Sequence, residues 1–221
     1  MTYRSLKQAG VVACLVFCAA CAQVALMSVT PVIAALASHL DQATARAIVD
    51  LEKKQDWPGM LSLARALLQR EPDRGDWWFL QGYVLSRQSQ HAEAVQSYER
   101  AIRLSPEDES SWLALGRSQS ELGQAERATQ TYRQALRYRP ESAPAYLALA
   151  ENYRQQGKPN VAIPAYLECV RYDPNSAQCW FGLAAAYQST GQSELRDGAL
   201  QGLRKLDPAS ADQLEKQYRA K

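Results

Sequence analysis

The chain has 221 residues, of which 47% are hydrophobic and 22% are charged, with 25 Lys and Arg residues against 23 Asp and Glu residues. This composition is typical of a folded globular protein and excludes general disorder. A net charge of only +2, without a long basic run, gives no reason to expect nucleic acid as a partner. Two distant histidines, His39 and His91, give little basis for a zinc site.

The N-terminal segment, residues 1–40, carries only two charged side chains, Arg4 and Lys7, and both are basic. No charged side chain occurs within residues 10–38. About 20 apolar residues in a helix cross the core of a bilayer, so residues 10–30 are long enough to span a membrane. The positive-inside tendency keeps the basic end in the cytoplasm and exports the rest of the chain.

Three fates of this segment are compatible with its residues. An uncleaved signal anchor agrees with an apolar run longer than a signal-peptide core. A cleaved signal peptide agrees with the small-x-small patterns Ala35-Leu36-Ala37 and Ala20-Cys21-Ala22. A lipoprotein would carry its lipid on Cys21, although Cys18 replaces the expected aliphatic residue. We expect an inner-membrane protein with periplasmic repeats; the alternative is a secreted, periplasmic or lipid-anchored protein after signal cleavage.

An internal repeat begins after residue 40, and five prolines spaced 34 residues apart reveal it. These prolines are Pro72, Pro106, Pro140, Pro174 and Pro208. The corresponding blocks are residues 41–74, 75–108, 109–142, 143–176 and 177–210. A fixed period of this length is the signature of stacked repeats. The remaining residues, 211–221, are expected to form a polar capping helix.

Each block alternates large and small residues at fixed positions. The fourth position of four blocks is aromatic, at Trp78, Trp112, Tyr146 and Trp180. The eighth position of the same blocks is Gly or Ala, which allows two antiparallel helices to approach closely. Three blocks place a glycine where the first helix would end in a left-handed cap, at Gly123, Gly157 and Gly191. The proline then ends the second helix, so each block is predicted to be a helix–turn–helix.

This pattern resembles the tetratricopeptide repeat family, and it is best preserved in residues 109–142. The matching residues are Trp112, Leu115, Gly116, Gly123, Ala128, Tyr132, Ala135 and Pro140. The resemblance covers residues 41–210 and implies an all-α, right-handed superhelical solenoid of five repeats, preceded by the hydrophobic helix. Departures lie mainly at the ends. Gln55 and Ser89 replace the turn glycine, and Arg196 replaces a small residue, so its helix is expected to shift or pack loosely.

The resemblance further implies a binding scaffold, in which the first helices of successive repeats line a concave groove for a peptide or a partner helix. Nine residues at groove positions are Phe79, Tyr83, Arg87, Leu113, Arg117, Leu147, Glu151, Arg154 and Phe181. This apolar stripe, flanked by three arginines, suits an amphipathic or extended segment with aliphatic anchors and some acidic character. A structural role of the apolar residues in packing between helices is the alternative.

Two pairs of residues, the cysteines around Pro174 and the adjacent tryptophans, each allow two structural interpretations. Cys169 and Cys179 flank the turn at Pro174, so antiparallel helices can bring them together as a disulfide; alternatively, Cys169 only replaces the usual alanine. Trp78 is expected in the core because it holds the fourth position. Trp77 either covers the atypical first repeat or forms an exposed anchor for a partner.

We expect no enzyme, because no phosphate loop, nucleophile elbow or metal-ligand spacing occurs in the sequence. No cofactor and no small-molecule substrate are expected either. The leading interpretation is a membrane-tethered or exported scaffold that mediates protein–protein interaction in assembly of a bacterial envelope complex. The alternatives are a chaperone for an exported client such as an apocytochrome, and a structural subunit of a membrane complex held by its N-terminal helix.

Overall fold

The structure is a computed structural model that describes residues 33, 36 and 40–219. The predicted membrane segment, residues 10–30, and the lipidation candidate Cys21 lie outside the described residues. Among the residues that are described, no helix is both long and apolar enough to cross a bilayer. The chain divides into two compact units, Met1–Met60 and Leu61–Lys221.

The first unit contains helix α3 (Gln42–Lys53) and the beginning of α4 (Trp57–Arg70). The carboxylate of Asp41 caps α3, because it accepts two backbone N–H groups of the first turn at 3.0 and 3.1 Å. The turn after α3 passes through Gln55, whose φ of 53° lies in the left-handed region. The turn conformation expected of a glycine is therefore kept without one.

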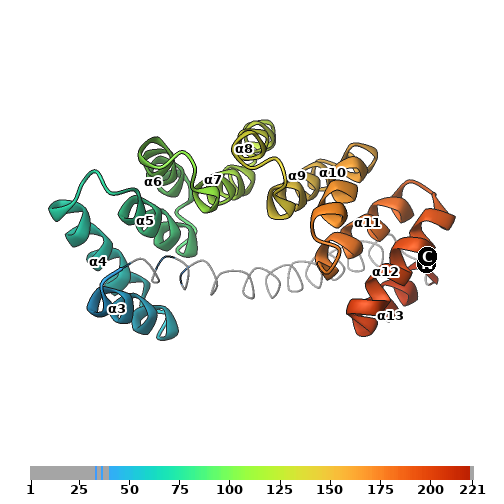
Figure 1. The fold of residues 1–221 in the computed structure, drawn as a ribbon, viewed down its shortest axis with the longest axis horizontal. Coiled ribbons are helices and arrows are strands. Elements are labelled where there is room, and N and C mark those ends of the chain that lie inside the picture. The colour runs from blue at the N-terminus through green and yellow to red at the C-terminus, as the bar shows by residue number, and fades with distance from the viewer. Residues whose placement is uncertain (1–32, 34–35, 37–39, 220–221) are drawn as a thin grey trace, which may run out of the picture. The chain divides into compact units, whose positions relative to one another are not determined.

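The second unit continues α4 and then consists of consecutive helices, each of which from α5 onward packs against the next (Figure 1). These helices are α5 (Gly75–Arg87), α6 (His91–Leu104), α7 (Glu109–Glu121), α8 (Ala125–Tyr138), α9 (Ala143–Gln155), α10 (Pro159–Tyr172), α11 (Ala177–Ser189), α12 (Ser193–Leu206) and α13 (Pro208–Arg219). Within this unit the first helices of the repeats, α5, α7 and α9, lie on the inner side, and the second helices, α6, α8 and α10, lie on the outer side (Figure 1). The predicted all-α fold is confirmed for the described residues.

The last position of three blocks, 75–108, 109–142 and 143–176, caps the helix that follows it. The carboxylate of Asp108 accepts two backbone N–H groups of α7 at 3.0 and 3.2 Å. The hydroxyl of Ser142 accepts one from α9 at 3.0 Å, and that of Ser176 accepts one from α11 at 3.4 Å. These caps explain why the helices begin at the block boundaries, since each satisfies backbone donors that the first turn leaves free.

Left-handed residues end the first helices, as the glycine pattern predicts. Gly123, Gly157 and Gly191 have φ values of 73°, 71° and 74°. Ser89 occupies the same repeat position with a φ of 60°. The backbone of the turn is thus constant, and only the residue that adopts it differs.

Tyrosines of the second helices fill the space above glycines of the first helices. A Cβ atom on Gly82 would lie 2.8 Å from Cδ1 of Tyr98. Tyr132 covers Gly116 in the same way, whereas Tyr166 covers Gly182 of the following repeat. This pairing of a ring with a glycine confirms that small residues permit the close approach of the helices.

Of the two adjacent tryptophans, Trp78 is less buried than its repeat position predicts, whereas the burial of Trp77 excludes the exposed anchor. Trp77 is only 2% exposed, whereas Trp78 is half-buried. The indole N–H of Trp78 donates to the carbonyl oxygen of Pro72 at 2.7 Å. Trp112 and Trp180 repeat this bond, at 2.8 Å each, to the prolines six residues before them. A fourth-position tryptophan needs this polar partner at the turn, which keeps one edge of its ring near the surface.

The last repeat packs more regularly than Arg196 suggests. Helix α12 occupies the same positions of its repeat as α10 does. Nη1 of Arg196 donates to Oε1 of Gln188 at 2.7 Å, and the guanidinium lies 5.8 Å from the ring centroid of Tyr218 on α13. The arginine is therefore accommodated without a shift of α12. The capping helix begins at Pro208, earlier than predicted, because Asp207 caps it by accepting the N–H of Ser210 at 3.0 Å.

Candidate functional site

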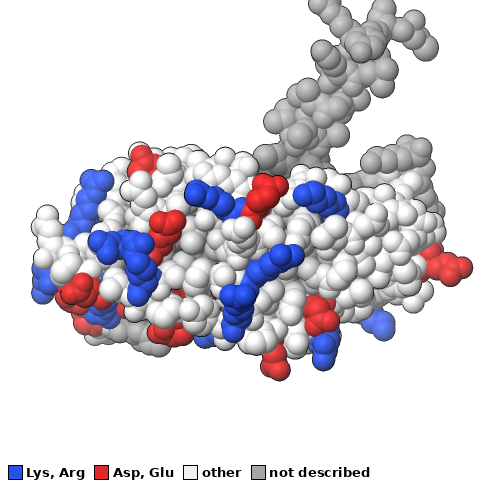
Figure 2. Space-filling model, turned by 90° about the horizontal axis from the view of Figure 1, so that it is seen from above, with Lys and Arg blue, Asp and Glu red and all other residues white. Residues whose placement is uncertain are grey.

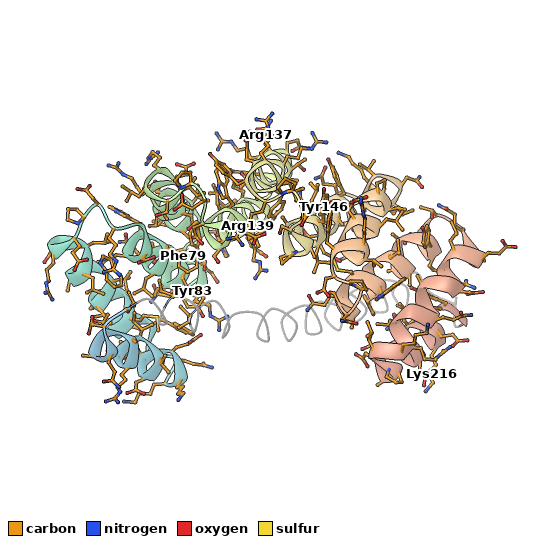
Figure 3. All side chains as sticks on the ribbon, viewed as in Figure 1. Phe79, Tyr83, Arg137, Arg139, Tyr146 and Lys216 are labelled. Carbon is orange, nitrogen blue, oxygen red and sulfur yellow. A yellow bond between two sulfur atoms is a disulfide. The ribbon has the colours of Figure 1, made fainter. Side chains whose placement is uncertain are left out.

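The predicted groove residues hold the fifth, ninth, twelfth and thirteenth positions of α5, α7, α9 and α11, but they differ in exposure. Phe79 and Tyr83 lie at α5 on the inner side (Figure 3) and are only 5% and 6% exposed. The ring of Phe79 packs on that of Tyr98 at a centroid distance of 5.7 Å. Both residues therefore contribute to packing between helices, as the structural alternative supposes.

Three apolar residues at the same repeat position retain accessible surface: Leu113, Leu147 and Phe181 are half-buried. They come from the first helices of three successive repeats, α7, α9 and α11, and α9 contacts both α7 and α11. Residues four apart lie on the same side of a helix, so the ninth positions share the face of the fifth. We call the surface formed by Leu113, Leu147, Phe181 and Arg117 the inner face.

Two of the predicted polar residues, Glu151 and Arg154, form a partly buried ion pair with each other. Nε and Nη2 of Arg154 donate to Oε2 of Glu151 at 2.9 and 2.6 Å, and the hydroxyl of Tyr166 donates to Oε1 at 2.5 Å. Although burial opposes its charge, the carboxylate of Glu151 raises the pKa of Arg154. Burial, and then the same carboxylate, raises the pKa of Tyr166, so this phenol stays protonated. Both carboxylate oxygens of Glu151 thus already have hydrogen-bond donors within the protein.

The other two arginines differ from each other. Arg87 is half-buried in the last turn of α5, whereas Arg117 is exposed on α7. The charge of Arg117 acts on the hydroxyls of Tyr98 and Tyr132, one from each neighbouring second helix. Burial raises the pKa of Tyr132 to about 12 and that of Tyr98 still further, so both phenols are neutral near pH 7. Arg117 forms no ion pair with any carboxylate among the described residues.

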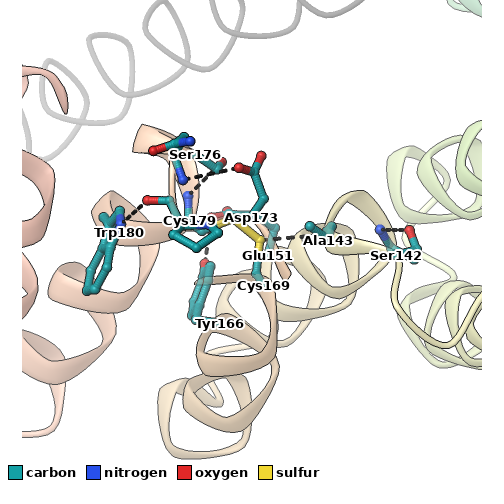
Figure 4. The surroundings of a disulfide bond; sticks show 12 residues. Ser142, Ala143, Glu151, Tyr166, Cys169, Asp173, Ser176, Cys179 and Trp180 are labelled. Atoms are coloured by element: carbon teal, nitrogen blue, oxygen red, sulfur yellow. Dashed lines mark hydrogen bonds between the residues drawn. A yellow bond between two sulfur atoms is a disulfide. The ribbon is translucent and has the colours of Figure 1, made fainter. Parts of the chain in front are cut away.

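A disulfide joins Cys169 of α10 to Cys179 of α11, with the Cα atoms 5.8 Å apart (Figure 4). Both cysteines are buried, and Sγ of Cys169 lies 3.3 Å from the carbonyl oxygen of Ala143. Leu147 of the inner face packs against this cluster. The covalent link between the last two repeats therefore also supports one residue of the inner face.

An open depression of about 660 Å³ lies at the turn between α8 and α9, and the sequence analysis did not identify it. Its lining residues are Glu109, Arg139, Pro140, Glu141, Ser142, Ala143, Pro144 and Asp173. Glu109 accepts a hydrogen bond from Ser142 and forms an ion pair with Arg139 at 3.4 Å. No motif or residue spacing in the sequence distinguishes these positions as a site. Within the described residues, no three His, Cys, Asp or Glu side chains are grouped so that they could hold a metal ion.

The outer side of the second unit has a different character. Figure 2, which looks onto this side, shows Lys and Arg side chains interspersed with Asp and Glu rather than one patch of a single sign. Arg137 lies at its outer edge (Figure 3). Leu167 of α10 and Leu195 of α12 are 45% and 52% exposed and come from second helices. Because these two leucines are exposed but lie outside the inner face, they can serve as controls for substitutions of Leu113 and Leu147.

Comparison with known proteins relates the chain to one family. Four family models described as tetratricopeptide repeat match residues 49–109, 85–153, 143–176 and 165–196. No curated protein matches the sequence.

Several solved structures share the fold. The MamA structure is 18% identical with a TM-score of 0.62, covering 83% of this chain and 99% of that chain. A thermophilic TPR protein of Thermus thermophilus is 17% identical with a TM-score of 0.63, covering 81% and 97%. YrrB, described as a TPR protein with an unusual peptide-binding site, is 17% identical with a TM-score of 0.60, covering 76% and 88%. At these identities the likeness concerns the fold alone.

Proposed function

This chain is a tetratricopeptide repeat protein, and we propose that its inner face binds a segment of a partner protein. The observation that carries the proposal is the register of Leu113, Leu147 and Phe181, which are half-buried at one repeat position of three successive helices. A row of this kind offers regularly spaced apolar contacts to an extended or helical segment. The peptide-binding site named for YrrB, a protein of the same fold, is consistent with such a role.

The energetics favour a reversible complex. Each of the three side chains already has part of its surface buried, so covering the rest contributes about 1 kcal/mol per residue. Three such contacts, about 3 kcal/mol together, do not by themselves offset the cost of association, which is about 4–15 kcal/mol. The segment therefore also needs polar contacts with the inner face.

We further propose that residues 10–30 anchor the chain in the inner membrane of a bacterium, and that the periplasmic repeats act in assembly of an envelope complex. Arg4 and Lys7 before the uncharged stretch support this orientation. The disulfide between Cys169 and Cys179 also supports it, because disulfides persist in oxidising compartments such as the periplasm.

Affinity purification from detergent-solubilised membranes tests the binding role. The inner-face variant carries Leu113→Gln and Leu147→Gln, and the matched control carries Leu167→Gln and Leu195→Gln, which are exposed on second helices. We expect the control to recover the same partners as the wild type and the inner-face variant to lose them. Equal recovery by both variants, with equal melting temperatures, overturns the proposal.

The membrane proposal is tested separately with spheroplasts. Protease added outside an intact inner membrane should digest the repeats, and the protein extracted from the membrane should have the mass of the uncleaved chain. Protected repeats contradict the orientation. A mass that has lost the first 22 or 37 residues indicates signal cleavage, and a lipid adduct on Cys21 indicates a lipoprotein.

A further inference from the structure

We infer that the segment bound by the inner face presents an acidic side chain to Arg117, beside an apolar side chain that packs on Leu113. This inference rests on the proposed function and specifies the chemistry of its partner. It follows from comparing how each charged residue predicted for the groove is used in the structure.

The only carboxylate among the predicted groove residues is already neutralised. Both oxygens of Glu151 accept hydrogen bonds, Oε2 from Arg154 and Oε1 from Tyr166. A cation of a partner would have to displace these bonds, and breaking such a pair leaves a partly buried charge without its counterion. Glu151 is therefore a poor anchor for a basic segment.

Among the predicted arginines, Arg117 is the one that combines exposure with the absence of an ion pair among the described residues. Arg154 is held by Glu151, and Arg87 is half-buried. Leu113 precedes Arg117 by one helical turn, so an apolar contact and a positive charge lie side by side on α7. Glu121 lies one further turn along and makes no ion pair with Arg117 in the described structure.

The surroundings of Arg117 favour a carboxylate ligand. A guanidinium offers a planar fork of donors that matches a carboxylate. The phenols of Tyr98 and Tyr132, on which the charge of Arg117 acts, are neutral near pH 7, as an ordinary phenol also is, and add no negative charge, although the carboxylate of Glu121 also acts on Tyr132. An acidic side chain thus meets attraction from Arg117 without repulsion from these tyrosines.

A selection experiment tests the chemistry without knowledge of the natural partner. The full-length chain, purified in mild detergent, is used to select from a phage-displayed library of random 12-residue peptides. We expect selected peptides to place Asp or Glu next to a large apolar residue. Fluorescence anisotropy with one such peptide should show at least about tenfold weaker binding to Arg117→Gln and an affinity that falls with salt. The control, Arg137→Gln on the outer side, should bind as the wild type does.

Charge exchange gives a result that a structural effect of the substitution cannot produce. The Arg117→Glu variant should bind the original peptide poorly but recover binding to the same peptide with its acid replaced by Lys. The acidic ligand is overturned if the selected peptides show no acidic enrichment. It is also overturned if binding is insensitive to Arg117→Gln yet lost in the Leu113→Gln, Leu147→Gln variant. Either result leaves the proposed function standing. Peptide binding that the Leu113→Gln, Leu147→Gln variant leaves unchanged overturns both.

Discussion

Gly116 of α7 lies directly against the ring of Tyr132 of α8, so that a Cβ atom on Gly116 would overlap the aromatic carbons. Tyr132 is 4% exposed and belongs to the core of the second unit, so its ring has little room to move. We expect Gly116→Ala to lower the free energy of unfolding by about 1–3 kcal/mol through overpacking. Urea unfolding followed by circular dichroism measures this change.

Gly198 provides the matched control, because it is also a glycine inside a helix but has nothing within 4 Å of the position of a Cβ. Gly198→Ala should stabilise the protein by about 0.5–1 kcal/mol, since alanine has the higher helix propensity. If both substitutions change stability in the same direction, the contact with Tyr132 does not explain the role of Gly116.

Ser89 adopts a left-handed conformation that glycine adopts at the equivalent position of the next repeats. We expect Ser89→Gly to stabilise the protein by about 0.5–1 kcal/mol, because it removes the strain of a Cβ at positive φ. The reciprocal change, Gly123→Ser, should destabilise it, although nothing within 4 Å would contact the new Cβ. Thermal unfolding of the two variants checks both signs, and a stabilising Gly123→Ser contradicts the explanation.

The disulfide between Cys169 and Cys179 closes a loop of about ten residues across the boundary of two repeats. Its removal in a Cys169→Ala, Cys179→Ala variant should lower the free energy of unfolding by about 2–3 kcal/mol. Dithiothreitol should destabilise the wild type by a similar amount and leave this variant unchanged. An unfolding midpoint in urea that is the same with and without reductant contradicts the prediction.

Buried tyrosines make stability depend on alkaline pH. Burial raises the pKa of Tyr132 in the folded chain to about 12 from an ordinary value of 10. Between these values the unfolded chain loses the proton while the folded chain keeps it, so stability falls as pH rises, by about 1.4 kcal/mol per pH unit for this residue. Urea titrations from pH 9 to 12 measure the slope, and Tyr132→Phe should make it shallower. An unchanged slope in this variant assigns the pH dependence to other tyrosines.

The repeated pattern was sufficient to predict the fold because each helix boundary depends on residues close in sequence. The caps at Asp108 and Ser142 and the turn at Gly123 are local features with a fixed position in the block. The ion pair between Glu151 and Arg154 was not predictable in this way. Arg154 and Glu151 were both expected to face a ligand, but their ion pair and the bond from Tyr166 depend on side-chain directions between two helices.

The burial of Phe79 and Tyr83, which were expected to face the groove, was not predicted for a related reason. A repeat position defines which side of a helix a residue occupies, but neighbouring elements determine how much of it remains exposed. Phe79 holds the same position as the half-buried Leu113, yet it is 5% exposed and its ring packs against the ring of Tyr98 in a tilted arrangement. Equal positions in a repeat therefore do not imply equal accessibility, particularly in the repeats near an end of the array.

The hydrogen bonds from tryptophan indoles to proline carbonyls have a mechanical consequence. The turns at Pro72, Pro106 and Pro174 are each tied to the following helix by such a bond. At Pro140 the corresponding residue is Tyr146, which has no indole N–H and stacks instead on Tyr172 at 5.7 Å. The same turn lines the open depression. The side chains of Ser142 and Arg139 bind Glu109, which lies on α7 rather than on the helix that follows the turn. We therefore expect the curvature of the second unit to change most readily at the junction of α8 and α9.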